Sequence, residues 1–371
     1  MGGNQVKYNS AKFNALSTTG AIAMVIKQRT ILTRSVPFLV IGLIVLVLYL
    51  HFFVGIENLI QLFQSVNLLY YSLAFVVSLL SIAFYSLTWQ HFLKLLSIKI
   101  GFPKTFLFVW VATFVDILIP AESISSEISK AYLISRSAGK DTGKAVASIV
   151  SHRILSMAIT TTALIISSVL LIIKYELSPF ILIFMVIVII GTLSSIVLLS
   201  YLSFKEQTTW KLINRILGFV EFISRGRWQV TNLKTKAKKM LKLFQEGIKT
   251  LIERPRQLAL PVVFSLLAWI SDVLISFFVF ISLGKDDVSF VVIVIVYTLS
   301  MAVQYFPLGI PAEVGLTEIF MTSLYALLGI DLAISAAAAV LTRLLTVWFR
   351  FFVGYASFIR WIGTEFLTGD G

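Results

Sequence analysis

Long apolar runs alternate with short polar segments along most of the chain. Six of these runs are long enough to cross the hydrocarbon core of a bilayer, which takes about 20 apolar residues. They lie at about 35–54, 68–93, 145–173, 179–202, 258–283 and 332–359. No small-residue cleavage site follows the first run, so we interpret it as a retained transmembrane helix and not as a signal peptide.

Two further apolar stretches are interrupted. Residues 105–136 and 288–330 begin as apolar helix, reach a proline and carboxylates, and continue as amphipathic helix. This pattern predicts a re-entrant hairpin in each stretch, which enters the membrane, breaks and leaves on the same side. The expected fold is an all-α polytopic membrane protein with about six full transmembrane helices and two such hairpins.

The polar segments mark the expected domain boundaries. Residues 1–34 form a polar N-terminal segment, and residues 203–257 form a linker between transmembrane halves at 35–202 and 258–360. Residues 361–371 form a short C-terminal tail.

Basic residues are distributed unevenly between the two sets of loops. Residues 203–256 hold 13 basic and four acidic residues, which supplies +9 of the net charge of +13. The loops at 94–104 and 136–144 are also basic, whereas the opposite loops carry only Lys174 and Lys285. Because basic loops stay on the cytoplasmic side, we expect a multi-pass protein of the cell membrane with both termini in the cytoplasm. The first hairpin then opens to the cytoplasm and the second to the outside.

The basic linker predicts two amphipathic helices at the membrane surface. The apolar face of the first holds Trp210, Ile213, Leu217 and Val220, and that of the second holds Leu233, Leu241, Phe244, Ile248 and Leu251. A basic amphipathic helix binds anionic lipid headgroups, so membrane lipids are the expected partners and nucleic acid is not.

Composition limits which kinds of site and cofactor we expect. Hydrophobic residues make up 58% of the chain and charged residues only 13%, about half of the charged share in a soluble domain. There are no cysteines and only three histidines, so we expect no metal site and no cofactor. No phosphate-binding loop for ATP is present, and uphill transport would need an ion gradient or a partner.

A nine-residue motif occurs twice. Ile-Pro-Ala-Glu at 119–122 is followed by Glu127, and Ile-Pro-Ala-Glu at 310–313 is followed by Glu318. A Gly-x-Asp turn follows each copy, and Arg153 and Arg343 follow at matching distances in the next apolar run. With the predicted topology, the two copies have opposite orientations, which is the inverted-repeat design of secondary transporters.

The proline and first carboxylate of each copy fit the start of a new helix. Pro120 and Pro311 mark the hairpin breaks, since proline suits the first position of a helix. Glu122 and Glu313 then fall in the first turn, where a carboxylate complements the helix N-terminus. Two helix N-termini at mid-depth would form a cavity that attracts anions.

Charged residues within the apolar runs are the candidate ligand-binding residues. Arg153 and Arg343 each need a partner or a water-filled cavity, because a lone arginine inside a membrane costs roughly 2.5–3.5 kcal/mol or more. One alternative is an ion pair with Glu127 or Glu318; the other is a clamp for a lipid phosphate, to which guanidinium binds in bidentate fashion. Both alternatives hold if the pair opens for a ligand.

Other polar residues in the apolar runs have weaker claims to a role. Asp116, His152 and Asp272 are candidate cavity-lining residues, and the two aspartates are equally candidates for helix-to-helix hydrogen bonds. His152, next to Arg153, fits a packed histidine better than a proton relay. Trp89 lies near the predicted cytoplasmic end of its span, and we interpret it as an interfacial anchor.

These residues resemble the lysylphosphatidylglycerol synthase transmembrane region, also called the flippase-like family, over roughly residues 35–360. The resemblance implies two opposed re-entrant hairpins around a lipid headgroup cavity, in which Arg153, Arg343, Glu122, Glu127, Glu313 and Glu318 bind the headgroup. The family often has an acidic residue before the intramembrane arginine, where this chain has His152. Because about ten residues follow the last predicted span, we expect no aminoacyl-transferase domain and no catalytic residues.

The leading functional prediction is a flippase or scramblase for a phosphate-bearing lipid, such as a phospholipid, an aminoacyl-lipid or a polyprenyl-phosphate-linked lipid. One alternative is an ion-coupled transporter of a small solute. The other is a membrane glycosyl- or phosphotransferase with a polyprenyl-phosphate donor, for which Asp286 and Asp287 are the one acidic pair in an outer loop. The small residues Ala336–Ala339 allow close helix packing within the chain or in a homodimer.

Overall fold

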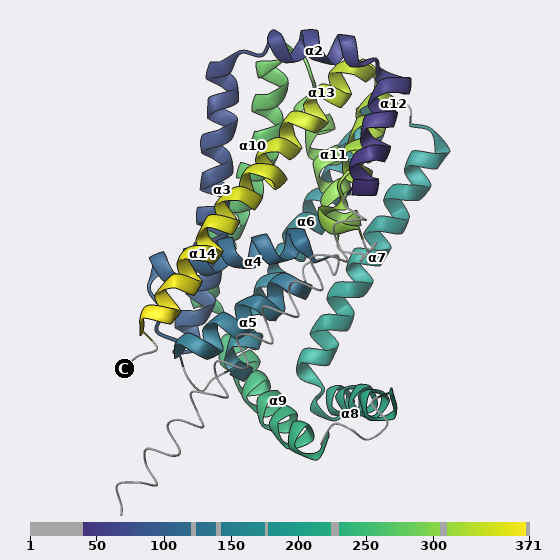
Figure 1. Cartoon of the computed structure of the whole chain (residues 1–371). Helices are drawn as coiled ribbons and strands as arrows, with labels where there is room; N and C mark the ends of the chain where they lie inside the picture. The colour runs from purple at the N-terminus through teal and green to yellow at the C-terminus, as the bar shows by residue number, and fades with distance from the viewer. Residues whose placement is uncertain are drawn as a thin grey trace, which may run out of the picture.

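The computed structural model describes residues 40–119, 124–138, 142–174, 177–223, 230–304 and 310–368. Every secondary-structure element in these ranges is helical (Figure 1). The predicted N-terminal segment at 1–34 and the end of the C-terminal tail lie outside the described residues.

Within the described part of the chain, five helices are long and apolar enough to cross a membrane. They are α3 (Leu68–Leu95), α6 (Thr142–Lys174), α7 (Pro179–Phe204), η2 (Pro255–Leu258) with α10 (Ala259–Ser282), and α13 (Leu332–Arg343) with η4 (Leu344–Phe349) and α14 (Arg350–Thr368). The remaining predicted span is described as an apolar helix over Val40–Val54, whose last turn η1 (Leu50–Val54) is a π-helix. The chain is a polytopic α-helical membrane protein.

Three helices begin at a side chain that caps the backbone. Asn67 accepts a hydrogen bond from the Leu69 N–H at the start of α3, and Ser178 accepts one from Ile181 at the start of α7. Asp331 accepts two at the start of α13. Such caps satisfy the first N–H groups of a helix, which have no partner within it.

Two ends of the molecule can be told apart. The short helix α2 (Ile56–Gln64) covers one end, where the Asn67 N–H donates to the Ser282 carbonyl at 2.8 Å (Figure 1). Helices α8 (Glu206–Ile223) and α9 (Val230–Ile252) lie at the other end, below the start of α6. The basic loops therefore gather at the α9 end, and the prediction that this end is cytoplasmic stays a prediction.

Helix α9 packs against protein with most of its apolar face. Leu241, Phe244, Ile248 and Leu251 are buried in a cluster with Phe92, Leu96 and Ala147. Gly143 allows this contact, because a Cβ there would lie 2.4 Å from the Met240 carbonyl oxygen. The expectation that this face rests on lipid is therefore wrong for these four residues, because the start of α6 covers them.

Helix α8 divides its apolar residues between two faces. Trp210 and Ile213, on the predicted face, pack partly against the α9 cluster. Leu212, Ile216 and Phe219 recur at helical spacing on another face and are exposed. The exposed apolar residues of α8 therefore include these three, which the predicted face did not contain.

The two interrupted stretches each contain a pair of shorter helices. The first pair is α4 (Phe102–Leu118) and α5 (Ile124–Ala138), and the second is α11 (Phe290–Val303) and α12 (Leu316–Leu327). Each has at most 17 residues, which at about 1.5 Å per residue is less than the roughly 30 Å of a bilayer core. In Figure 1, α4 and α5 lie toward the α9 end, whereas α11 and α12 lie toward the α2 end.

The break in the second stretch differs from the expected one. Pro311 begins a short 3₁₀ turn, η3 (Pro311–Glu313), and the return helix α12 begins only at Leu316. Ala312 and Glu313 both have a φ of 50°, which ends the turn before a helix can form. Glu318, not Glu313, lies in the first turn of α12. The matching residues of the first copy, Pro120 and Glu122, lie outside the described residues.

The alanine run at 336–339 packs within the chain. Its four residues are at most 1% exposed and belong to the largest apolar cluster, where α13 meets α10 and α12. The small side chains serve close packing inside this chain, so this run does not offer a surface to a second copy.

Gly42 and Gly315 hold the first described helix against the second break. A Cβ on Gly315 would lie 2.3 Å from the Gly42 carbonyl oxygen, and a Cβ on Gly42 would lie 2.3 Å from that of Val314. Gly315 also has a φ of +88°, a backbone angle that residues with a Cβ rarely adopt. The two backbones therefore touch directly at the level of the break.

Gly315→Ala should lower the free energy of unfolding through both the contact and the backbone conformation. The left-handed conformation alone costs about 1–2 kcal/mol for a residue with a Cβ. The clash with Gly42 should add to that loss, and thermal unfolding in detergent measures the sum.

Two matched variants separate these causes. Gly329→Ala should lose stability through the backbone conformation only, because Gly329 has a φ of +91° and nothing lies within 4 Å of its Cβ position. Gly42→Ala should lose stability through the clash only. If Gly315→Ala were no more harmful than Gly329→Ala, the close contact would not contribute to stability.

Candidate functional site

A cavity of about 360 Å³ lies at the centre of the protein, between the two pairs of short helices and α3, α6, α10 and α14. Helix α4 contacts the 3₁₀ turn η3, so the second break lies against the helix that leads into the first. The charged and titratable groups on its wall include Asp116, Glu127, Lys130, His152, Arg153, Asp272, Glu313, Arg343 and Arg350. In an otherwise apolar body, this cavity collects the charges of the apolar runs.

Arg153 on α6 forms an ion pair with Glu127 on α5. Its Nη1 lies 2.7 Å from Glu127 Oε1, and 18% of the arginine side chain and 26% of the glutamate side chain are exposed. The pair is therefore open to the cavity.

Arg343 on α13 forms the corresponding pair with Glu318 on α12. Its Nε lies 3.0 Å from Glu318 Oε1, and only 8% and 3% of the two side chains are exposed. Arg343 Nη2 also donates to the Ala312 carbonyl, and Glu318 Oε2 accepts from the Gly315 N–H at 2.7 Å. This second pair is closed and is tied to the backbone of the break.

The two pairs occupy the same places in the repeated motif. In each copy, the second glutamate of the motif binds the arginine of the next helix. The ion pair that the sequence offered as one alternative is therefore present in both copies. The copies differ in exposure, since both residues of the first pair line the cavity, whereas in the second pair only Arg343 does and both side chains are at most 8% exposed.

Two aspartates connect further helices around the cavity. Asp272 Oδ1 on α10 accepts from Arg350 Nη2 at 2.8 Å and from Ser81 Oγ at 2.6 Å, which joins α10 to α14 and α3. Asp116 on α4 accepts from Ser125 Oγ and from the Ser126 N–H at the start of α5. Both residues line the cavity, and both also make the helix-to-helix hydrogen bonds that were the alternative.

The sequence is similar to those of known membrane proteins. Residues 39–354 match the family described as the lysylphosphatidylglycerol synthase TM region. The chain belongs to this family. A UPF0104 membrane protein of Pyrococcus horikoshii is 24% identical over 322 residues, which cover 85% of this chain and 94% of the relative. A UPF0104 membrane protein of Methanothermobacter thermautotrophicus is 22% identical over 324 residues, which cover 87% of this chain and 94% of the relative.

Within this member of the lysylphosphatidylglycerol synthase TM family, two cavity cations were missed by the sequence analysis. Lys130 lies three residues after Glu127 on α5, and Arg350 lies seven residues after Arg343, across the π-helix η4. With the α-helical period, both spacings put the cation on the same helix face as a predicted site residue. The helical period could therefore have predicted both.

Other predicted residues have mixed outcomes. Glu313 lines the cavity and accepts a hydrogen bond from Thr317, and Pro311 is buried in η3. His152 is packed as expected, but its Nε2 has no hydrogen-bond partner among the described residues.

Trp89 is fully buried and donates to Ser148, so its interpretation as an interfacial anchor is wrong. Trp89 packs in a buried apolar cluster formed by α3, α4, α5 and the start of α6, which accounts for its burial.

The acidic pair of the transferase alternative lies elsewhere. Asp286 and Asp287 are exposed in the turn between α10 and α11 and do not line the cavity. Among the described residues, no group of three or more His, Asp or Glu side chains is placed to hold a metal ion.

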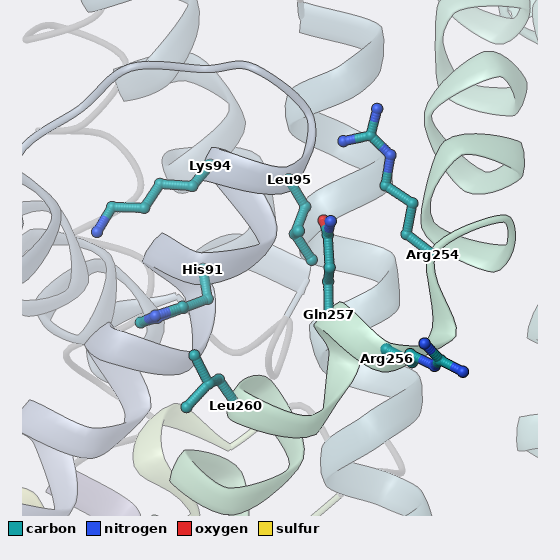
Figure 2. Close-up of a pocket in the computed structure, with 7 residues that line it drawn as sticks. All are labelled: His91, Lys94, Leu95, Arg254, Arg256, Gln257 and Leu260. Carbon is teal, nitrogen blue, oxygen red and sulfur yellow. The ribbon is translucent and has the colours of Figure 1, made fainter.

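A smaller hollow of about 300 Å³ lies between the end of α3 and η2. It is lined by Lys94, Arg254 and Arg256 together with His91 and Leu260. Figure 2 shows these three cationic side chains pointing in different directions rather than toward one point. The hollow is basic, but its charges do not converge as those of the central cavity do.

Removal of Arg343 should destabilise the protein more than removal of Arg153. Breaking a buried ion pair by removing one partner costs about 3–5 kcal/mol, because the other charge stays buried. We expect a loss in that range for Arg343→Met, and on the order of 1 kcal/mol for Arg153→Met, whose partner Glu127 reaches the open cavity. Unfolding of the purified variants in detergent measures the difference.

The double variant Arg343→Met/Glu318→Gln is the control. It removes both charges but keeps an oxygen that accepts from Gly315, so most of the lost stability should return. An equal or larger loss for Arg153→Met would contradict the difference in burial on which this prediction depends.

Proposed function

We propose that the protein moves a phosphate-bearing lipid between the two leaflets, as a flippase or scramblase. The observation that carries the proposal is the charged cavity between the two pairs of short helices, inside an apolar membrane body. The lipid headgroup would occupy the cavity, and its tails would stay among the exposed apolar side chains outside.

The two pairs of short helices support a transport mechanism. We interpret α4–α5 and α11–α12 as re-entrant hairpins that open to opposite sides, and the two motif copies as an inverted repeat. Substrate sites of secondary transporters lie near the midplane, where such broken helices meet. Opposed hairpins could then expose one cavity to each side in turn.

The arginine–carboxylate pairs supply the chemistry for a phosphate. A phosphate oxyanion can replace the carboxylate on a guanidinium, because both present two oxygens to the same planar donor. In this conformation Arg153 is the accessible arginine, whereas Arg343 is held by Glu318 and Ala312. A headgroup that enters the cavity would therefore meet Arg153 before Arg343.

Ion-coupled transport of a small solute is the second candidate. The carboxylates of Asp116 and Asp272 in the same cavity favour it, because such groups carry coupling protons or cations in transporters. Solute uptake driven by a proton or sodium gradient would distinguish it from lipid movement.

Lipid movement can be tested in proteoliposomes of the purified protein. Phospholipids with a label on the acyl chain keep their native headgroup, and a membrane-impermeant quencher reports how fast the inner-leaflet label reaches the outside. We expect the wild type to move lipid at least tenfold faster than the variant Arg153→Ala/Arg343→Ala, which lacks both guanidinium groups.

The matched control is Arg136→Ala/Arg360→Ala, which removes two exposed arginines that do not line the cavity. Its rate should equal that of the wild type. Because Arg343 contributes to stability, the cavity variant must first be shown to be folded, and Arg153→Ala alone provides a milder test. Equal lipid movement by the wild type and the folded cavity variants would refute the mechanism.

A further inference from the structure

Lys130 is the cavity cation with the most unusual surroundings. Its side chain is 96% buried, with 4% exposed, and its Nζ donates to Tyr85 Oη at 2.7 Å. The same nitrogen lies 4.6 Å from the centre of the Tyr85 ring and 5.6 Å from that of the Trp89 ring. Its contacts are therefore with a neutral hydroxyl and two aromatic faces.

The other cavity cations each have a carboxylate partner. Arg153, Arg343 and Arg350 are paired with Glu127, Glu318 and Asp272. Among the described residues, no carboxylate forms an ion pair with Lys130. Glu127 is paired with Arg153, and Asp116, which attracts Lys130 from beyond ion-pair distance, accepts hydrogen bonds from Ser125 and Ser126.

A buried ammonium with no carboxylate in direct contact lowers stability, because cation–π contacts offset only part of its desolvation. A position that keeps such a charge on the wall of a cavity is suited to receive an anion, which would bond to the ammonium directly.

A polar atom without a partner lies beside the Tyr85 ring. His152 is buried, its ring centre lies 4.3 Å from that of Tyr85, and its Nε2 has no hydrogen-bond partner among the described residues. This nitrogen can donate to an anion when it carries the ring proton. The Tyr85 hydroxyl accepts from Lys130, which leaves its own proton free to donate. Lys130, Tyr85 and His152 all line the cavity.

We infer that Lys130, Tyr85 and His152 form an oxyanion subsite that receives the phosphate of the ligand. The inference rests on the proposed function and narrows it, because it names the residues that the phosphate contacts first. Binding at Arg153 would have to break a 2.7 Å ion pair, whereas binding at Lys130 replaces contacts with neutral groups. The phosphate therefore binds to Lys130 first, and an arginine pair opens for it only afterwards.

A phospholipid headgroup and a soluble phosphate ester share this chemistry, so the test uses both. Purified protein in detergent is titrated calorimetrically with dihexanoyl phosphatidylglycerol, with glycerol 3-phosphate and with inorganic phosphate. We expect the wild type to bind the short-chain lipid, and Lys130→Met to bind it at least tenfold more weakly, since a charge-assisted hydrogen bond is lost. Lys130→Arg should bind within about threefold of the wild type.

Lys104→Met is the matched control. Lys104 lies on α4 of the same helix pair and also lies over an aromatic ring, at 5.9 Å from the centre of Phe108, but it does not line the cavity. Its affinity for the probes should be unchanged. Thermal unfolding separates a structural role from a binding role, because Lys130→Met removes an unpaired buried charge and should be at least as stable as the wild type.

Each result decides a different point. Equal Lys130-dependent binding of the soluble phosphates would support the subsite but make a soluble ligand, not a lipid, its occupant. Wild-type affinity in Lys130→Met, or no binding of any probe by the wild type, would overturn the inference, even if lipid movement is found in proteoliposomes. If Lys130→Met does not fold, Tyr85→Phe carries the test, since it keeps the ring and should weaken binding several-fold through loss of the hydroxyl.

Discussion

A charged side chain inside an apolar helical body must meet an opposite charge, another polar group or a water-filled cavity, because hydrocarbon offers it no hydration. This constraint is met three times around one cavity, by the pairs Arg153–Glu127, Arg343–Glu318 and Arg350–Asp272. Each pair joins two different helices. The charges that line the cavity therefore also hold the central helices in place.

The same charged side chains also form hydrogen bonds with the backbone where helices are interrupted. A break in a membrane helix frees N–H and carbonyl groups that find no water, and they must be satisfied by protein. At the second break, Arg343 binds the Ala312 carbonyl and Glu318 binds the Gly315 N–H. At the start of α5, Asp116 accepts from the Ser126 N–H. Broken helices and buried charges are thus two parts of one arrangement.

The two copies of the motif make the same ion pair in different surroundings. The pair of the first copy faces the cavity, and that of the second copy is buried and bonded to the backbone. Under the proposed function, this difference makes the first copy the accessible half of the site. Lys130 belongs to the same half. It contacts neutral groups, whereas each cavity arginine is paired with a carboxylate, and we therefore infer that the ligand binds at Lys130.

The sequence by itself determined the helical membrane class, the spans and the charged residues that had to be buried, because apolar length and the cost of a lone charge are local properties. Arg153 and Arg343 and their glutamates were predictable, since the repeated motif placed them at equal spacing. Only the tertiary structure decided which copy is sealed, that α12 begins at Leu316, that α9 packs on protein, and that Lys130 meets Tyr85 and Trp89 instead of a carboxylate. These features depend on contacts between helices that are distant in sequence. The residue pattern of one segment does not show which other segment packs against it.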